Sequence, residues 1–150
     1  MNRTRCALAL LAVSYAAIAT AAPAVEPSAA DKAAIFKAAG FKAKGGKFVR
    51  CEDDSPSAVP GSIEMEDLNG DGNAEAWVKE SSTNCYGMTA EAFVLLTKDA
   101  KSSWTVILDQ VGIAVVQTKK HKGWFGIEVG GPGMGPFPVY RYNGKKYATR

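Results

Sequence analysis

Short runs of alternating apolar and polar residues, separated by turn-forming residues, fill most of the sequence after residue 46. A period of two places alternate side chains on opposite faces of a β-strand, and the β-branched and aromatic residues of these runs favour strands. The runs cover residues 47–51, 63–66, 74–79, 93–97, 104–108, 113–118, 124–129, 139–142 and 146–148. Their spacing predicts a mostly antiparallel β-sheet of about eight short strands. No internal repeat of 20–50 residues is visible in the sequence.

The last two runs are separated by Asn143–Gly144. This pair predicts a tight hairpin, because both central residues of a type I′ turn need positive φ.

One helix is predicted before the first strand. Ser28 is a suitable N-cap with Asp31 in the first turn, and the alanine-rich run that follows favours a helix. Gly40 stands where a left-handed residue ends a helix, and Phe41 can fold back onto Phe36. The predicted fold class is therefore α+β, with an N-terminal helix packed on the sheet.

The first 24 residues have the layout of a cleavable secretory signal peptide. Two arginines precede an apolar run at residues 6–19, and small residues follow as far as Ala24. The run is shorter than the ~20 residues that a membrane-spanning helix needs, and no later segment is longer. We therefore expect cleavage near Ala24, one domain at residues 25–150 in the periplasm or secreted, and no membrane insertion afterwards.

Two of the three cysteines, Cys51 and Cys85, lie in the expected mature domain. An even pair in an oxidising compartment predicts a disulfide. Their wide spacing and the absence of a CxxC pair do not indicate a redox motif or a zinc site. The predicted bond should stabilise the fold by about 3–4 kcal/mol on the chain-entropy account.

Charge is distributed unevenly along the chain. Without the two arginines of the expected signal, the 18 basic residues fall to 16, against 15 acidic residues, so the net charge of the domain is about +1. This near-neutral total argues against a nucleic-acid-binding protein. Residues 51–80 hold nine acids and one base, whereas residues 101–150 hold eight bases and two acids. Either these are two solvated faces of one domain, or an acidic end binds a metal and a basic end meets an anionic partner.

The segment Asp67-Leu68-Asn69-Gly70-Asp71-Gly72-Asn73-Ala74-Glu75 is the most specific motif of the chain. Oxygen-bearing side chains occupy alternate positions, and a glycine follows the third of them. A flexible loop of this kind can supply several of the six to eight oxygen ligands that Ca²⁺ takes. The oxygen-bearing residues of the segment are Asp67, Asn69, Asp71, Asn73 and Glu75. The alternative is a metal-free turn, since Asn, Asp and Gly favour turns by themselves.

The loop is not an EF-hand, because its twelfth residue is Val78 rather than a bidentate Glu. Residues 66–78 instead resemble the calcium loops of FG-GAP and VCBS-type repeats, in which such a segment joins two strands. The resemblance covers about a dozen residues and one copy of a unit that those families repeat into a propeller. It implies a cation-binding hairpin with Asp67, Asn69, Asp71 and Glu75 as ligands and Asn73 contributing its carbonyl oxygen.

Catalytic chemistry is weakly indicated. His121, the single histidine, is predicted to lie in an exposed lysine-rich turn, and the chain contains no G-x-S-x-G motif for a nucleophile. Glu64 and Glu66 share one face of a predicted strand, as paired carboxylates of a glycosidase would. They are more simply the solvent-facing side of that strand, opposite Lys79.

The segment 130–138 alternates glycine and proline and carries two apolar residues, Met134 and Phe137. It is either a structural crossover whose Phe137 packs inward or a protruding recognition loop. Tyr140, Arg141 and Tyr142 follow it, and Tyr and Arg are enriched at interface hot spots.

Three functions are compatible with these features. The first is a small exported, non-enzymatic binding module for a protein or envelope component, stabilised by one Ca²⁺. The second is an inhibitor of a hydrolase, such as a cell-wall lytic enzyme, that inserts the Gly130–Pro138 loop into its target. The third is a small hydrolase that uses Glu64 and Glu66.

Overall fold

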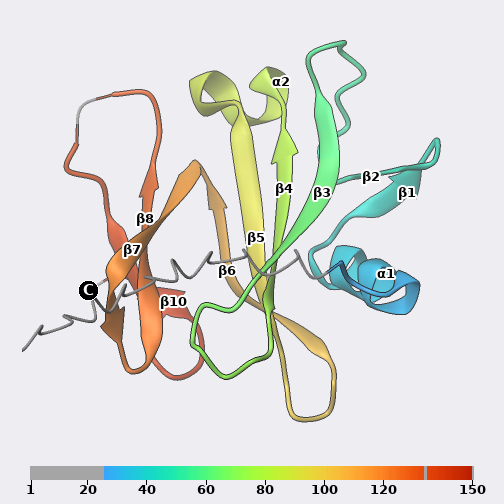
Figure 1. Ribbon diagram of the computed structural model, residues 1–150. Helices are drawn as coiled ribbons and strands as arrows, with labels where there is room; N and C mark the ends of the chain where they lie inside the picture. Colours follow the sequence, from blue (N-terminus) through green and yellow to red (C-terminus); the bar gives the residue numbers. More distant parts are fainter. Residues whose placement is uncertain (1–25, 134, 150) are drawn as a thin grey trace, which may run out of the picture.

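The computed structural model describes residues 26–133 and 135–149 (Figure 1). The expected signal segment and Met134 therefore lie outside the described residues. The elements in chain order are α1 (Ala29–Ala38), β1 (Lys42–Lys44), β2 (Lys47–Val49), β3 (Val59–Glu66), β4 (Glu75–Ser81), α2 (Thr83–Tyr86), the 3₁₀ turn η1 (Gly87–Thr89), β5 (Glu91–Lys98), β6 (Trp104–Val111), β7 (Ile113–His121), β8 (Trp124–Gly130), β9 (Val139–Tyr142) and β10 (Tyr147–Ala148).

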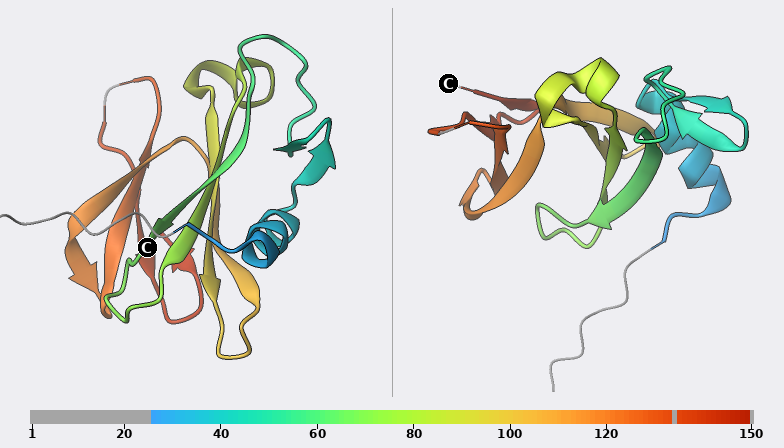
Figure 2. Two further views of the ribbon diagram at one scale, coloured as in Figure 1. Left: turned by 45° about the vertical axis from the view of Figure 1, so that its right-hand side comes forward. Right: turned by 90° about the horizontal axis from the view of Figure 1, so that it is seen from above.

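The strands form three antiparallel sheets arranged in layers. A first sheet of order β3-β4-β5-β6 lies in the middle, and a second sheet of order β10-β9-β8-β7 lies on one side of it. Helix α1 and the β1–β2 hairpin lie on the other side, as the view from above in Figure 2 shows. The predicted α+β class, with an N-terminal helix and mostly antiparallel strands, is confirmed, although the described residues form ten strands rather than eight.

Helix α1 begins and ends as its sequence predicts. The Ser28 hydroxyl accepts a hydrogen bond from the Asp31 amide at 3.1 Å. At the other end Gly40 has φ +81°, and the Phe41 amide donates to the Phe36 carbonyl at 2.9 Å, as in a Schellman motif. The Phe36 and Phe41 rings are 5.6 Å apart. This turn directs the chain from the helix into β1.

Two apolar clusters hold the layers together. Between α1 and the first sheet lie buried side chains of the helix, of the turn that follows it and of the sheet, namely Ile35, Phe36, Ala39, Phe41, Ala76, Val78, Val94 and Leu96. Between the two sheets lie Leu68, Trp77, Phe93, Leu95, Ile107, Leu108, Ile127, Val129 and Tyr147. Strands β4 and β5 are therefore buried on both faces, and burial does not alternate along them because each face is covered.

Disulfide Cys51–Cys85 joins the chain after β2 to α2, confirming the predicted pairing. The predicted hairpin at Asn143–Gly144 also forms, between β9 and β10, but it is not a two-residue type I′ turn. Only Gly144 has a positive φ, +106°. The Asn143 side chain instead accepts hydrogen bonds from the amides of Lys145 and Lys146. Its side-chain oxygen closes a longer turn, so the asparagine needs no left-handed backbone.

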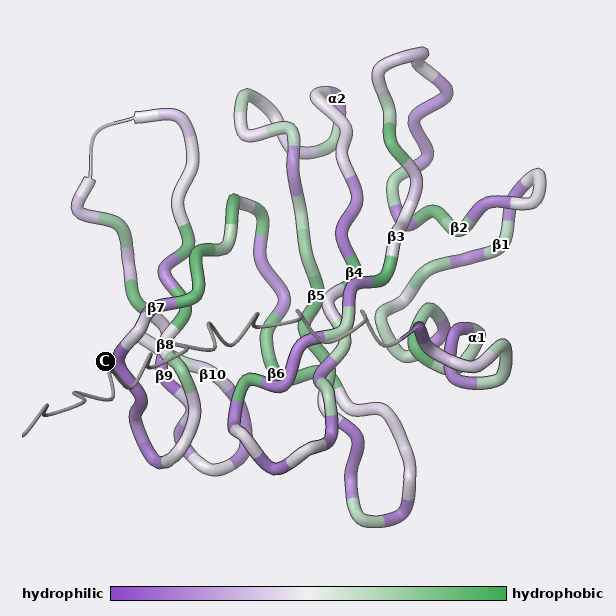
Figure 3. The backbone as a smooth tube through the Cα atoms, in the orientation of Figure 1, coloured by the Kyte–Doolittle hydropathy of each residue, from purple (hydrophilic) through white to green (hydrophobic). Residues whose placement is uncertain are grey.

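Each of the two larger sheets consists of four strands that are consecutive in the chain. The two sheets thus have the same topology, although the sequence shows no repeat. Figure 3 shows largely hydrophilic connections at the lower end of both sheets, including the β3–β4 loop and the β7–β8 turn. The topology brings these two connections, one acidic and one basic, to the same end of the molecule. In the part of the chain described, no helix has the length and apolar character needed to cross a membrane.

Candidate functional site

The loop between β3 and β4 is organised by its own side-chain oxygens. Both carboxylate oxygens of Asp67 accept backbone hydrogen bonds, from Gly70 at 2.7 Å and from Gly72 at 3.0 Å. These two bonds hold the pKa of Asp67 below its ordinary value, because they favour the ionised form. Asn69 and Asp71 each accept the amide two residues further along, both at 2.7 Å. The alternating pattern therefore builds successive tight turns.

Glu75 closes the loop from inside the molecule. It begins β4, is 2% exposed, and accepts hydrogen bonds from the Leu68 amide at 2.9 Å and the Thr97 hydroxyl at 3.1 Å. Burial raises the pKa of the Glu75 carboxyl to about 7; its two hydrogen bonds oppose this rise, and the nearby charges of Asp71 and Asp67 add to it. The loop thus has a buried carboxyl at its base and two exposed carboxylates above.

The second sheet reaches the same loop through two contacts. The Phe125 amide donates to the Leu68 carbonyl at 3.1 Å. The Lys120 ammonium donates to the Asn69 carbonyl at 3.1 Å and lies 4.4 Å from the centre of the Phe125 ring. The positive charge of Lys120 therefore lies in contact with the acidic loop. Sequence reasoning missed Lys120, although the apolar Leu68 inside a polar loop was a signal that the loop is anchored in the core.

The donor set of the loop fits a hard cation, since it offers carboxylate, amide and carbonyl oxygens without sulfur or imidazole. Asp67, Asn69 and Asp71 lie together on the loop, Asn73 is exposed beside them, and Glu75 lies beneath. Within residues 26–133 and 135–149, however, no three His, Cys, Asp or Glu side chains are gathered as a metal site. The five predicted ligands stay a prediction.

The raised pKa of Glu75 predicts that the stability of the protein depends on pH. A carboxyl with a raised folded-state pKa binds its proton more tightly in the folded protein, so its contribution to stability is greatest below pH 4.5 and is lost as pH rises through about 7. Relative to Glu75→Gln, the wild type should lose about 2 kcal/mol of unfolding free energy between pH 5 and pH 7. Glutamine can keep both hydrogen bonds. Urea denaturation of both proteins in chelator at several pH values measures the difference, and parallel pH profiles would contradict it.

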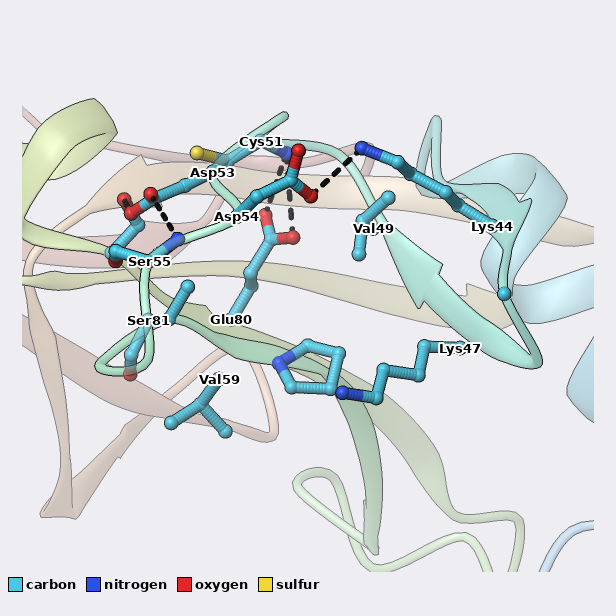
Figure 4. Close-up of a pocket in the computed structure, with 14 residues that line it drawn as sticks. Lys44, Lys47, Val49, Cys51, Asp53, Asp54, Ser55, Val59, Glu80 and Ser81 are labelled. Carbon is cyan, nitrogen blue, oxygen red and sulfur yellow. Dashed lines mark hydrogen bonds and ion pairs between the residues drawn. The ribbon is translucent and has the colours of Figure 1, made fainter.

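A cavity of about 290 Å³ opens at the opposite end of β3, between the β1–β2 hairpin and residues 53–60 (Figure 4). Glu80, 3% exposed, lies at its base. Its carboxylate accepts hydrogen bonds from the Arg50 amide at 2.9 Å, from the Cys51 amide, and from the Tyr86 hydroxyl at 2.6 Å. Burial and this last bond raise the pKa of Tyr86 to about 12.

The polar groups of this cavity are engaged with one another. Lys44 and Asp54 form an ion pair at its mouth, 2.9 Å apart. Asp53 accepts bonds from Ser82 and Asn84, which with the Ser55 amide lower its pKa to about 2. Sequence analysis did not identify this cavity, because it depends on how the disulfide-linked segment folds over β4. The contacts around Glu80 are those of a structural hub.

The two residues proposed for hydrolysis have separate partners. The Glu64 carboxylate pairs with the Lys79 ammonium at 2.6 Å, and the Glu66 carboxylate accepts the Trp77 indole N–H at 2.9 Å. The strand residue opposite Lys79 is Ser62, so the ion pair with Glu64 is diagonal across the two strands. His121 is not in a turn: it is the last residue of β7 and is half-buried, and the turn is Lys122–Gly123.

The residues proposed for partner binding do not form one surface. Phe137 packs its ring on Gly130, where an added Cβ would lie 2.9 Å from the ring. Tyr140 and Tyr142 face the core between the sheets, Tyr140 donating to the Gln110 amide oxygen at 2.9 Å and Tyr142 stacking on Trp124. Arg141 lies on the other face, because successive side chains of a strand alternate. Met134 is outside the described residues.

Comparison of the chain with protein-family models, with curated proteins and with solved structures found no match. What the site can do chemically is therefore argued from its own residues.

Proposed function

We propose that the protein is an exported, non-enzymatic binding module whose Asp67–Glu75 loop is stabilised by one Ca²⁺. The main support is the arrangement of oxygens in that loop: Asp67, Asn69 and Asp71 at alternate positions of a glycine-containing turn, with Glu75 behind them. A bound cation would relieve the mutual repulsion of these carboxylates. The loop is closed by hydrogen bonds to Asp67, which limits the backbone freedom that cation binding would have to remove.

Export is the second part of the proposal. The disulfide Cys51–Cys85 is of the kind that persists in oxidising compartments. The first 24 residues have the three-part layout of a secretory signal. Both features favour a periplasmic or secreted protein that meets an envelope component or another protein.

A calorimetric Ca²⁺ titration of the purified protein tests the cation site. We expect saturable binding and, at about 100-fold excess over Kd, about 2.7 kcal/mol of added stability, visible as a higher Tm. Asp67→Asn/Asp71→Asn should abolish both effects because it removes two ligand charges.

A matched control is Glu52→Gln/Asp54→Asn, which removes two exposed negative charges at the other end of β3. This variant should bind Ca²⁺ as the wild type does. If Ca²⁺ produces no heat of binding and no change in the Tm of the wild type, the loop is a metal-free turn. If both double variants lose Ca²⁺ binding equally, the cation is attracted by the overall negative charge and does not bind at a specific site.

A further inference from the structure

The outer face of the second sheet contains a basic hollow next to the cation loop. A cavity of about 310 Å³ is lined there by residues of β7, β8 and β9, including Lys119, His121, Gly126 and Arg141. It lies on the side of the sheet away from the first sheet, since the intervening side chains of these strands, such as Ile127 and Tyr140, pack into the core.

The hollow exists because its floor is a glycine. A Cβ added to Gly126 would lie 3.4 Å from Val139 and 3.6 Å from Gln117, which flank it on the neighbouring strands. The space that a side chain would take is left open between them. The main chain of Gly126 is nevertheless buried, so the floor is a fixed part of the sheet.

The lining is strongly cationic. Lys119, Lys120 and Arg141 each contribute a full positive charge, and no carboxylate lines the cavity. Lys120 is held at one side by the Asn69 carbonyl. The four ion pairs of the described residues lie elsewhere and include neither Lys119 nor Arg141. Two cationic side chains outside these ion pairs, Lys119 and Arg141, with Lys120 beside them, favour a multiply charged anion over a single carboxylate.

The side chains present the donors that a phosphate group needs. The guanidinium of Arg141 can bind two oxygens of one anion, the lysine ammonium groups act as point charges, and Gln117 adds an amide. We propose that this hollow binds the phosphate group of a small ligand. Its size suits a phosphate with a small attached group. The site adjoins the cation loop through Lys120, which binds the Asn69 carbonyl, and it would place the anionic partner on the basic half of the chain.

Backbone amide NMR titrations with inorganic phosphate and with glycerol 3-phosphate test the site and distinguish the free anion from its ester. Saturable shifts of the Gln117, Gly126 and Arg141 amides with either probe are expected. Sodium chloride at equal ionic strength should not reproduce them. Arg141→Gln should raise the Kd at least about tenfold, whereas Lys145→Gln, which removes one exposed charge from the β9–β10 turn, should change it less than about twofold.

Lys119→Gln provides a second test in case Arg141→Gln perturbs β9. This variant should also raise the Kd for phosphate. The proposal is wrong if the shifts do not saturate, if chloride produces them equally, or if Lys145→Gln weakens binding as much as the cavity variants. It is also wrong if succinate saturates the same amides and neither phosphate probe does.

Discussion

Replacing Leu68 by Ala should lower the free energy of unfolding by about 3 kcal/mol, within the range of 2–5 kcal/mol for a buried Leu→Ala change. Leu68 has no exposed surface and packs in the cluster between the two sheets. The effect should extend to the loop, because the Leu68 amide binds Glu75 and its carbonyl accepts the Phe125 amide. We therefore expect weaker Ca²⁺ binding as well as a lower urea midpoint.

Leu68→Met is the matched control. It nearly conserves volume and should cost less than about 1.5 kcal/mol, leaving Ca²⁺ binding close to that of the wild type. Urea denaturation in chelator measures stability without the cation. A loss below 1 kcal/mol in Leu68→Ala would show that the loop is not anchored by this side chain.

Removing the disulfide should have a comparable effect. Cys51→Ser/Cys85→Ser frees a closed loop with a sequence separation of 34, which should cost about 3–4 kcal/mol on the chain-entropy account. The denaturant slope m should also increase, because the unfolded chain without a cross-link exposes more surface. Locally, the Cys51 amide donates to the buried Glu80 carboxylate, so the wall of the cavity above Glu80 should loosen.

Reduction of the wild type offers an independent comparison. A reducing agent should shift the wild-type urea midpoint toward that of the double variant and leave the double variant unchanged. A urea midpoint of the double variant equal to that of the oxidised wild type would mean that packing alone fixes this segment. Equal sensitivity of both proteins to the reductant would point to an effect unrelated to the bond.

Local features were predictable from the sequence. The two ends of α1 are set by Ser28 and Gly40, whose partners lie within a few residues, and the Asp67 loop is closed by its own side chains. The disulfide was predictable for another reason, since two cysteines allow one pairing. Strand β1 was missed because its three residues, Lys42–Lys44, are all exposed and show no apolar alternation.

Features that depend on the stacking of layers were not predictable. The sequence predicts Glu75 both at the start of the strand at 74–79 and as a loop ligand, but it does not predict that the side chain is buried, because that depends on both faces of β4 being covered. Lys120 looks like one of several exposed lysines until the second sheet brings it to Asn69. The aromatic segment after Pro138 was interpreted as one surface, yet alternation within β9 sends its tyrosines and Arg141 to opposite faces.

The order of the strands has a consequence for how fast the molecule can form. Every strand pairing joins two strands that are neighbours in the chain, so no ladder requires a distant segment to arrive first. Such local pairing lowers the contact order of each sheet and favours rapid folding for a β-rich protein. The contacts that join distant segments are those between the layers, including the bond between Phe125 and Leu68. Docking of two preformed meanders is therefore the step that should limit the folding rate.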